Sequence, residues 1–100
     1  MKNPYITVEI IRISGKRETK QIPKDVVWKE IDAIIGAQFL DHVNLRDGRM
    51  MWVDDLGHDK QLPTNAIATE LYWSVCRPGT LHRIVGDVVI TNEADFEDEE

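Results

Sequence analysis

The chain has 100 residues, 42% of them hydrophobic and 30% charged, which predicts one folded domain with a single modest core. The formal net charge is −6, but six acids lie in the last eight residues, so residues 1–92 hold twelve acids and twelve Lys and Arg. Because residues 1–92 carry no excess of basic residues, the composition argues against general binding of nucleic acid through phosphate contacts. No apolar run is long enough to span a bilayer, and the N-terminal residues lack the zones of a signal peptide. Together with the single cysteine, these features predict a cytoplasmic protein without membrane association.

The first half of the chain predicts a β-hairpin, a helix and a second hairpin. Apolar residues alternate in the first strand, and their phase slips near Ile10, either at a bulge or because both faces are buried there. The helix has apolar residues at i, i+4, i+7 and i+8 from Val27, and Gly36 ends it. The predicted strands are residues 5–14 and 18–22, the helix starts at Pro23, and strands 39–45 and 50–53 flank an Asp-Gly turn at 46–49.

The second half predicts one more helix and a last strand. Thr64 or Asn65 caps the helix, and the Arg-Pro-Gly sequence at 77–79 ends it. Residues 83–91 are nearly continuously apolar, as is typical of a strand covered on both faces. The order ββαββαβ predicts an α+β fold in which one mostly antiparallel sheet carries two helices, within a single domain of residues 1–92. Residues 93–100 predict a disordered acidic tail.

The polar stretch between the two halves has two interpretations. Asp54, Asp55 and His58 are metal ligands by residue type, but their spacing matches no known metal-binding loop. The simpler interpretation is a turn in which the aspartates bond their own backbone and Gly57 supplies a positive φ. Because no ligand set is defined, the sequence predicts neither a metal site nor a cofactor. The three histidines, His42, His58 and His82, are each expected at the surface or bonded to backbone.

No residue is predicted to be catalytic. Cys76 paired with a histidine would be a nucleophile, but its place late in a helix favours a small buried thiol. Nucleophile-elbow, phosphate-loop and dinucleotide motifs do not occur in the sequence. Asp87 lies inside the last apolar run, so we expect it to bond backbone amides beside Gly86, or else to pair with Arg83 or Arg77.

Aromatic residues provide the candidates for partner binding. Trp28 and Trp73 fall beside the apolar rows of their helices, which makes them interface candidates, whereas Trp52 fits core filling if its strand face is inward. The tail has one large apolar residue, Phe96. It is either a solvated terminus or a linear motif whose acidic residues attract a basic partner on which Phe96 docks. The candidate partner-binding residues are therefore Trp28, Trp73, Phe96, Glu97 and Asp98.

Three short motifs carry a family resemblance. Asp-x-Gly at 55–57, Leu-Pro-x-Asn at 62–65 and Ile-x-Gly-Asp at 84–87 follow one another with the spacing of that pattern. In this respect the chain, over roughly residues 30–91, resembles small bacterial, phage and plasmid proteins grouped as a domain of unknown function. His58 and the acidic tail lie outside the pattern. The resemblance implies a fold and a mobile-element setting but no reaction.

These observations lead to three functional hypotheses. The first is a small non-catalytic phage- or plasmid-type protein that binds and modulates a host protein complex, as an inhibitor of defence or regulation, in the host cytoplasm. The second is a small metal- or nucleotide-dependent enzyme, or a ligand-binding domain, that uses the loop from Asp54 to His58. The third is a structural or assembly subunit. The sequence leaves the oligomeric state open.

Overall fold

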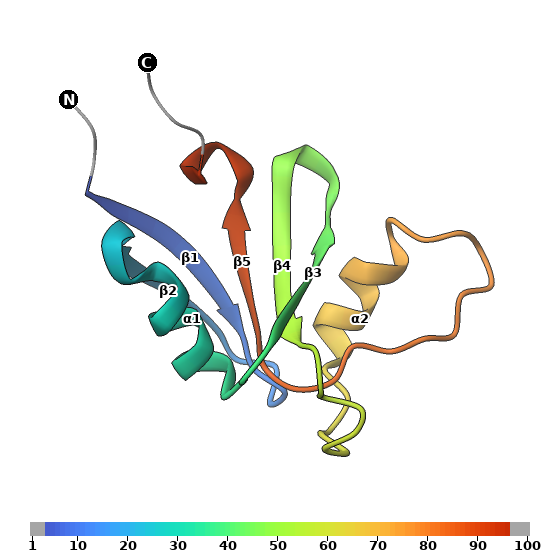
Figure 1. Ribbon diagram of the computed structural model, residues 1–100. Coiled ribbons are helices and arrows are strands. Elements are labelled where there is room, and N and C mark those ends of the chain that lie inside the picture. Colours follow the sequence, from blue (N-terminus) through green and yellow to red (C-terminus); the bar gives the residue numbers. More distant parts are fainter. Residues whose placement is uncertain (1–3, 97–100) are drawn as a thin grey trace.

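A computed structural model describes residues 4–96 and shows one antiparallel sheet between two helices (Figure 1). The predicted class, an α+β domain with one antiparallel sheet and two helices, is confirmed. The strands are β1 Tyr5–Ile11, β2 Arg17–Pro23, β3 Leu40–Asn44, β4 Arg49–Asp54 and β5 Val88–Asn92; the helices are α1 Val27–Ile35 and α2 Ala66–Trp73. Three short 3-10 helices, which the order ββαββαβ leaves out, are η1 Lys24–Val26, η2 Arg46–Gly48 and η3 Glu93–Phe96.

The last strand lies at the centre of the sheet. The strand order is β2-β1-β5-β4-β3, and every pairing is antiparallel. β5 takes this place because its residues from Val88 to Thr91 are all buried, as the apolar run predicted. β2 and β3 are left as the two edges of the sheet.

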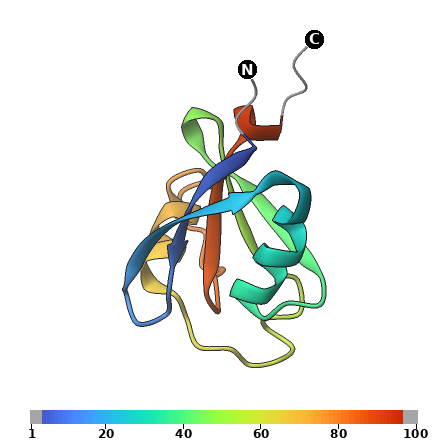
Figure 2. The same cartoon turned by 90° about the vertical axis from the view of Figure 1, so that its left-hand side faces the viewer.

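The two helices cover opposite faces of the sheet (Figure 2). Successive side chains of a strand point to opposite faces, and the two buried clusters divide accordingly. The α1 cluster contains Ile10 and Val89, whereas the α2 cluster contains Ile11 and Val88. β1 pairs regularly with β2 throughout, so burial of both faces, not a bulge, explains the phase slip near Ile10.

Several predicted turns and boundaries are present as expected. Gly36, at φ 75°, ends α1, and the Asp-Gly turn of the second hairpin has φ 66° at Asp47 and 72° at Gly48. Asn65, and not Thr64, caps α2 through its side chain. No helix among residues 4–96 is long and apolar enough to cross a membrane.

Other boundaries differ from the prediction. The last strand begins at Val88 instead of residue 83, because Gly86 has φ 80° and breaks the extended run. α2 ends at Trp73, earlier than the predicted end at Arg77. At this end of the helix the hydroxyl of Ser74 donates to the carbonyl of Leu71 at 2.6 Å. The first four residues of the predicted disordered tail form η3, so the prediction is wrong for this part of the tail; residues 97–100 lie outside the described chain.

Candidate functional site

The loop after β4 is held by a buried carboxylate. The side chain of Asp54 is 1% exposed, and its Oδ2 lies 2.6 Å from Lys60 Nζ. Its Oδ1 accepts the amide of Leu56 at 2.9 Å, and Lys60 also donates to the carbonyl of Gly36 at the end of α1. Asp54 is therefore occupied in closing its own turn and tying the loop to the helix.

Gly57 has a different role in this loop from the one predicted. The positive φ of the loop, 57°, belongs to Gln61. Gly57 is instead required by space, because a Cβ there would lie 2.9 Å from Val85 Cγ2 and 3.2 Å from the carbonyl oxygen of Asp54. The Asp-x-Gly motif thus serves close packing of the loop against residues 82–85.

A shallow pocket lies between this loop and the segment before β5. Its volume is about 210 Å³. His58 Nε2 lies 2.9 Å from the carbonyl oxygen of Arg83, and the rings of His58 and His82 are 4.8 Å apart. The polar lining side chains are Asp41, Asp54, Asp55, His58, His82 and Arg83.

This pocket does not assemble the metal ligands that residue type suggested. Within the described chain, no three His, Cys, Asp or Glu side chains are grouped to hold a metal ion. Asp54 faces Lys60, Asp55 is exposed, and His58 bonds a backbone carbonyl. The third histidine, His42, lies elsewhere, 5.0 Å from the ring of Trp52.

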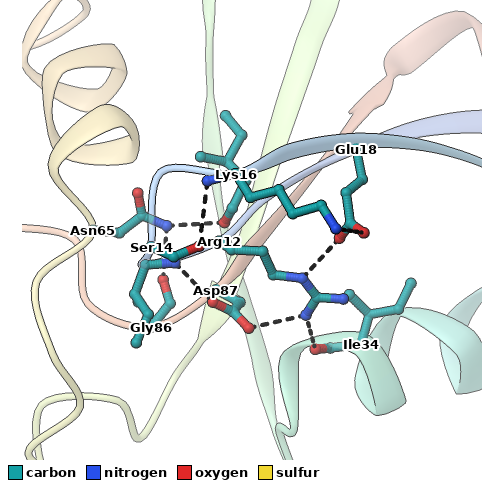
Figure 3. Close-up of polar contacts among 10 residues, drawn as sticks. Arg12, Ser14, Lys16, Glu18, Ile34, Asn65, Gly86 and Asp87 are labelled. Carbon is teal, nitrogen blue, oxygen red and sulfur yellow. Dashed lines mark hydrogen bonds and ion pairs between the residues drawn. The ribbon is translucent and has the colours of Figure 1, made fainter.

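Asp87, directly before β5, is linked through Arg12, directly after β1, to β2 and α1 (Figure 3). As expected, its Oδ1 accepts a backbone amide, that of Ile13, at 2.9 Å. Its basic partner is Arg12, at 2.9 Å, and not Arg83 or Arg77 as predicted, because the β1–β2 turn lies against the start of β5. Arg12 also donates to Glu18 at 3.0 Å and to the carbonyl of Ile34 at 3.2 Å.

The charges of this network reinforce one another. The hydrogen bond to Asp87, followed by that to Glu18, raises the pKa of Arg12 above its usual value. The same guanidinium, by donating to Glu18, lowers the pKa of that carboxyl. Both effects favour the charged forms that fasten the β1–β2 hairpin to the rest of the domain.

Cys76 is half-buried near the end of α2. Its hydrogen bond with the Tyr72 side chain raises the pKa of the Tyr72 hydroxyl. In turn, the ring of Tyr72 lies edge-on to His82, with centroids 5.9 Å apart. The prediction of a buried thiol late in the helix is therefore wrong, because α2 ends at Trp73 and Cys76 stays half-buried beyond it.

Four rings from four separate elements form a continuous group, which we call the aromatic surface: Phe96, Trp28, Trp52 and His42. Trp28 stacks on Phe96 at 5.3 Å and meets Trp52 edge-on at 4.7 Å. Trp52 is fixed by a hydrogen bond from Nε1 to Thr91 Oγ1 at 2.9 Å. Trp28 nevertheless remains 44% exposed.

The aromatic surface lies on the face of the sheet that α1 covers. The buried side of α1 packs on β1, β2 and β5 through residues such as Val8, Ile22 and Val89. α1 also contacts β4, and Trp28 meets Trp52 where the helix lies against that strand. Sequence reasoning found Trp28 and Phe96 separately but missed their pairing, since no local pattern links residues 68 positions apart.

The other tryptophan candidate lies on the opposite side of the sheet. Trp73 is 41% exposed, and its Nε1 donates to the carbonyl of His82 at 2.7 Å. It belongs to α2, which covers the face away from α1. Glu97 and Asp98, the remaining partner-binding candidates, lie outside the described residues.

No protein-family model, curated protein or solved structure matches this chain. The resemblance to mobile-element proteins therefore stays a prediction. The residues that carry it have structural roles here: Gly57 packs the loop, Asn65 caps α2, and Gly86 and Asp87 form the junction with β1. The geometry of these motifs explains a fold and does not define a reaction.

Proposed function

We propose that the protein is a small non-catalytic binding protein that modulates a protein complex through its aromatic surface. The observation that carries the proposal is Trp28, which is held by two ring contacts and still exposes 44% of its area. Tryptophan is enriched among the residues that contribute most of the binding energy at protein interfaces. Because Trp28 is already fixed, a partner would lose little side-chain entropy on binding it.

The proposed setting is a phage or plasmid product acting in the cytoplasm of its host. The support is the resemblance in the Asp-x-Gly, Leu-Pro-x-Asn and Ile-x-Gly-Asp motifs. In that setting the bound complex would be one of host defence or regulation, which the protein inhibits by occupying a contact surface.

A comparison of variants tests the binding function. Tagged full-length protein, Trp28→Ala and Trp73→Ala are each used to capture proteins from a bacterial lysate, and captured partners are quantified by mass spectrometry. We expect a stoichiometric partner that Trp28→Ala loses and Trp73→Ala retains. Equal capture by all three proteins, or capture of no specific partner, would contradict the proposal. Circular dichroism checks that both variants are folded.

A second candidate function is binding of a small polar ligand in the pocket beside the loop. The pocket of about 210 Å³, with Asp55, His58 and Arg83 on its wall, favours it. The thermal unfolding midpoint is measured with divalent ions and with nucleotides, for the original chain and for Asp55→Ala. An increase that Asp55→Ala abolishes would support this function over the first.

A further inference from the structure

The aromatic surface has an acidic border. Asp32 follows Trp28 by four residues and so lies on the same side of α1. Glu93 and Asp95 belong to η3, the element that carries Phe96. None of these three carboxylates has an ion-pair partner among residues 4–96. Lys29, the nearest base in sequence, is turned by about 100° around the helix from Trp28.

One further contact places a carboxylate at one end of this surface. The carboxylate of Glu93 lies beside the β3–β4 hairpin, 3.9 Å from where a Cβ of Gly48 would be. The sequence then continues beyond Phe96 with four consecutive acidic residues. Among the described residues, Glu93 and Asp95 thus bring two carboxylates into the element whose Phe96 stacks on the exposed Trp28.

We propose that the aromatic surface docks a basic amphipathic segment of the partner protein, in which arginine or lysine alternates with apolar residues. This inference rests on the proposed binding function and adds the chemistry of the partner. A guanidinium over the face of Trp28 gains a cation–π contact, and Asp32, Glu93 and Asp95 supply carboxylates for the neighbouring basic groups. Apolar residues of the same segment pack on Trp52 and Phe96.

The segment is expected to lie on the face of the sheet and not to extend its edge. β3 is an edge strand, but the amide of His42 donates to Asp41 Oδ1 at 2.8 Å. That carboxylate covers a donor that an added strand would need. The face beside β3 instead offers the rings of His42 and Trp52.

Fluorescence anisotropy with defined peptides tests the inference. The probe is a fluorescein-labelled peptide of about twelve residues that alternates arginine and leucine, and its control has glutamate in place of arginine. We expect the basic peptide alone to bind the full-length protein, with an affinity that falls between about 50 and about 300 mM sodium chloride.

Matched variants then locate the binding. Trp28→Ala should weaken binding of the basic peptide about tenfold, whereas Trp73→Ala should leave it unchanged. Glu93→Gln combined with Asp95→Asn should weaken it about threefold to tenfold and flatten its salt dependence. A variant in which the acids at 97–100 are replaced by glutamine and asparagine distinguishes a contribution of the tail from that of the aromatic surface. We expect its binding of the basic peptide still to depend on Trp28.

The outcomes are distinguishable from those of the proposed function. Equal binding of both peptides, equal loss in Trp28→Ala and Trp73→Ala, or binding that needs only residues 97–100 would overturn the inference. If the lysate experiment yields a partner that requires Trp28 while the basic peptide does not bind, the binding function stands and the basic-segment inference fails.

Discussion

At the scale of single residues, the buried side chain of Asn65 connects three parts of the fold. Its Oδ1 accepts the amide of Ala68 at 3.1 Å, which caps α2. Its Nδ2 donates to the carbonyls of Ile11 and Gly86, so one amide group ties the helix to β1 and to the segment before β5. The residue is 1% exposed, and water therefore cannot replace these bonds.

Replacement of Asn65 tests this role. Asn65→Ala should lower the free energy of unfolding by about 2–4 kcal/mol, since it removes the cap and leaves two buried carbonyls without a donor. Urea denaturation measures the change. Asn65→Asp keeps an acceptor for Ala68 but places a carboxylate against those carbonyls, so we expect at least as large a loss. Near-normal stability of Asn65→Asp would show that the cap alone matters.

The Arg12 network makes stability depend on pH through Glu18. The pKa of Glu18 is lowered in the folded state, mainly by the hydrogen bond from Arg12, relative to its ordinary value of 4.5. The stabilisation is therefore present above about pH 4.5 and is lost as the pH falls through the folded-state pKa. Unfolding free energies measured from about pH 6 to about pH 3 should decline less steeply for Glu18→Gln than for the original chain. An unchanged slope would contradict this role for Glu18.

At the scale of elements, the two edge strands are protected in different ways. β2 carries charged side chains along its length, including Arg17, which pairs with Glu9 at 3.0 Å. β3 has fewer charges, and the carboxylate of Asp41 bonds the amide of His42. Both devices discourage pairing with another chain.

Asp41→Ala should therefore promote self-association. Without the carboxylate, the amide of His42 is free to bond a strand from a second molecule. Sedimentation velocity over a series of concentrations should detect a larger species for this variant. Asp55→Ala is the control, because it removes the same charge from a neighbouring exposed position but bonds no edge amide. Identical behaviour of the two variants would mean that net charge, and not edge protection, sets association.

At the scale of the whole molecule, η3 completes the core on the α1 side of the sheet. Phe96 packs against the buried cluster of that side and stacks on Trp28. The chain segment after β5 is thus part of the domain as far as Phe96. This contact also sets how much of Trp28 is available to a partner.

Phe96→Ala should lower the free energy of unfolding by about 1–2 kcal/mol, because the ring is only partly buried. It should also increase quenching of tryptophan fluorescence by acrylamide, since Trp28 loses its cover. Leu81→Ala is the matched control: Leu81 is 83% exposed, and its truncation should change stability by less than about 0.5 kcal/mol. Equal effects of the two substitutions would place Phe96 outside the core.

Elements with a strong local signal were predictable from the sequence. The buried side of α1, with Val27, Ile31 and Ile35, follows from helical spacing, and Gly36 and the Asp-Gly turn mark its end and the second hairpin. The start of the last strand was wrong, because an apolar run does not show that Gly86 adopts a positive φ. The basic partner proposed for Asp87 was wrong for a similar reason: its charge partner, Arg12, lies 75 residues away, directly after β1.

The sequence by itself determined the α+β class, the burial of the last strand on both faces and the charge balance, because each follows from local periodicity or composition. Only the tertiary structure decided which distant side chains meet. It separated Asp54, Asp55 and His58 into different roles, and it brought Trp28, Trp52 and Phe96 together. The reason is physical: contacts between elements depend on strand order and on which part of a face a helix covers, and neither is encoded in the spacing of neighbouring residues.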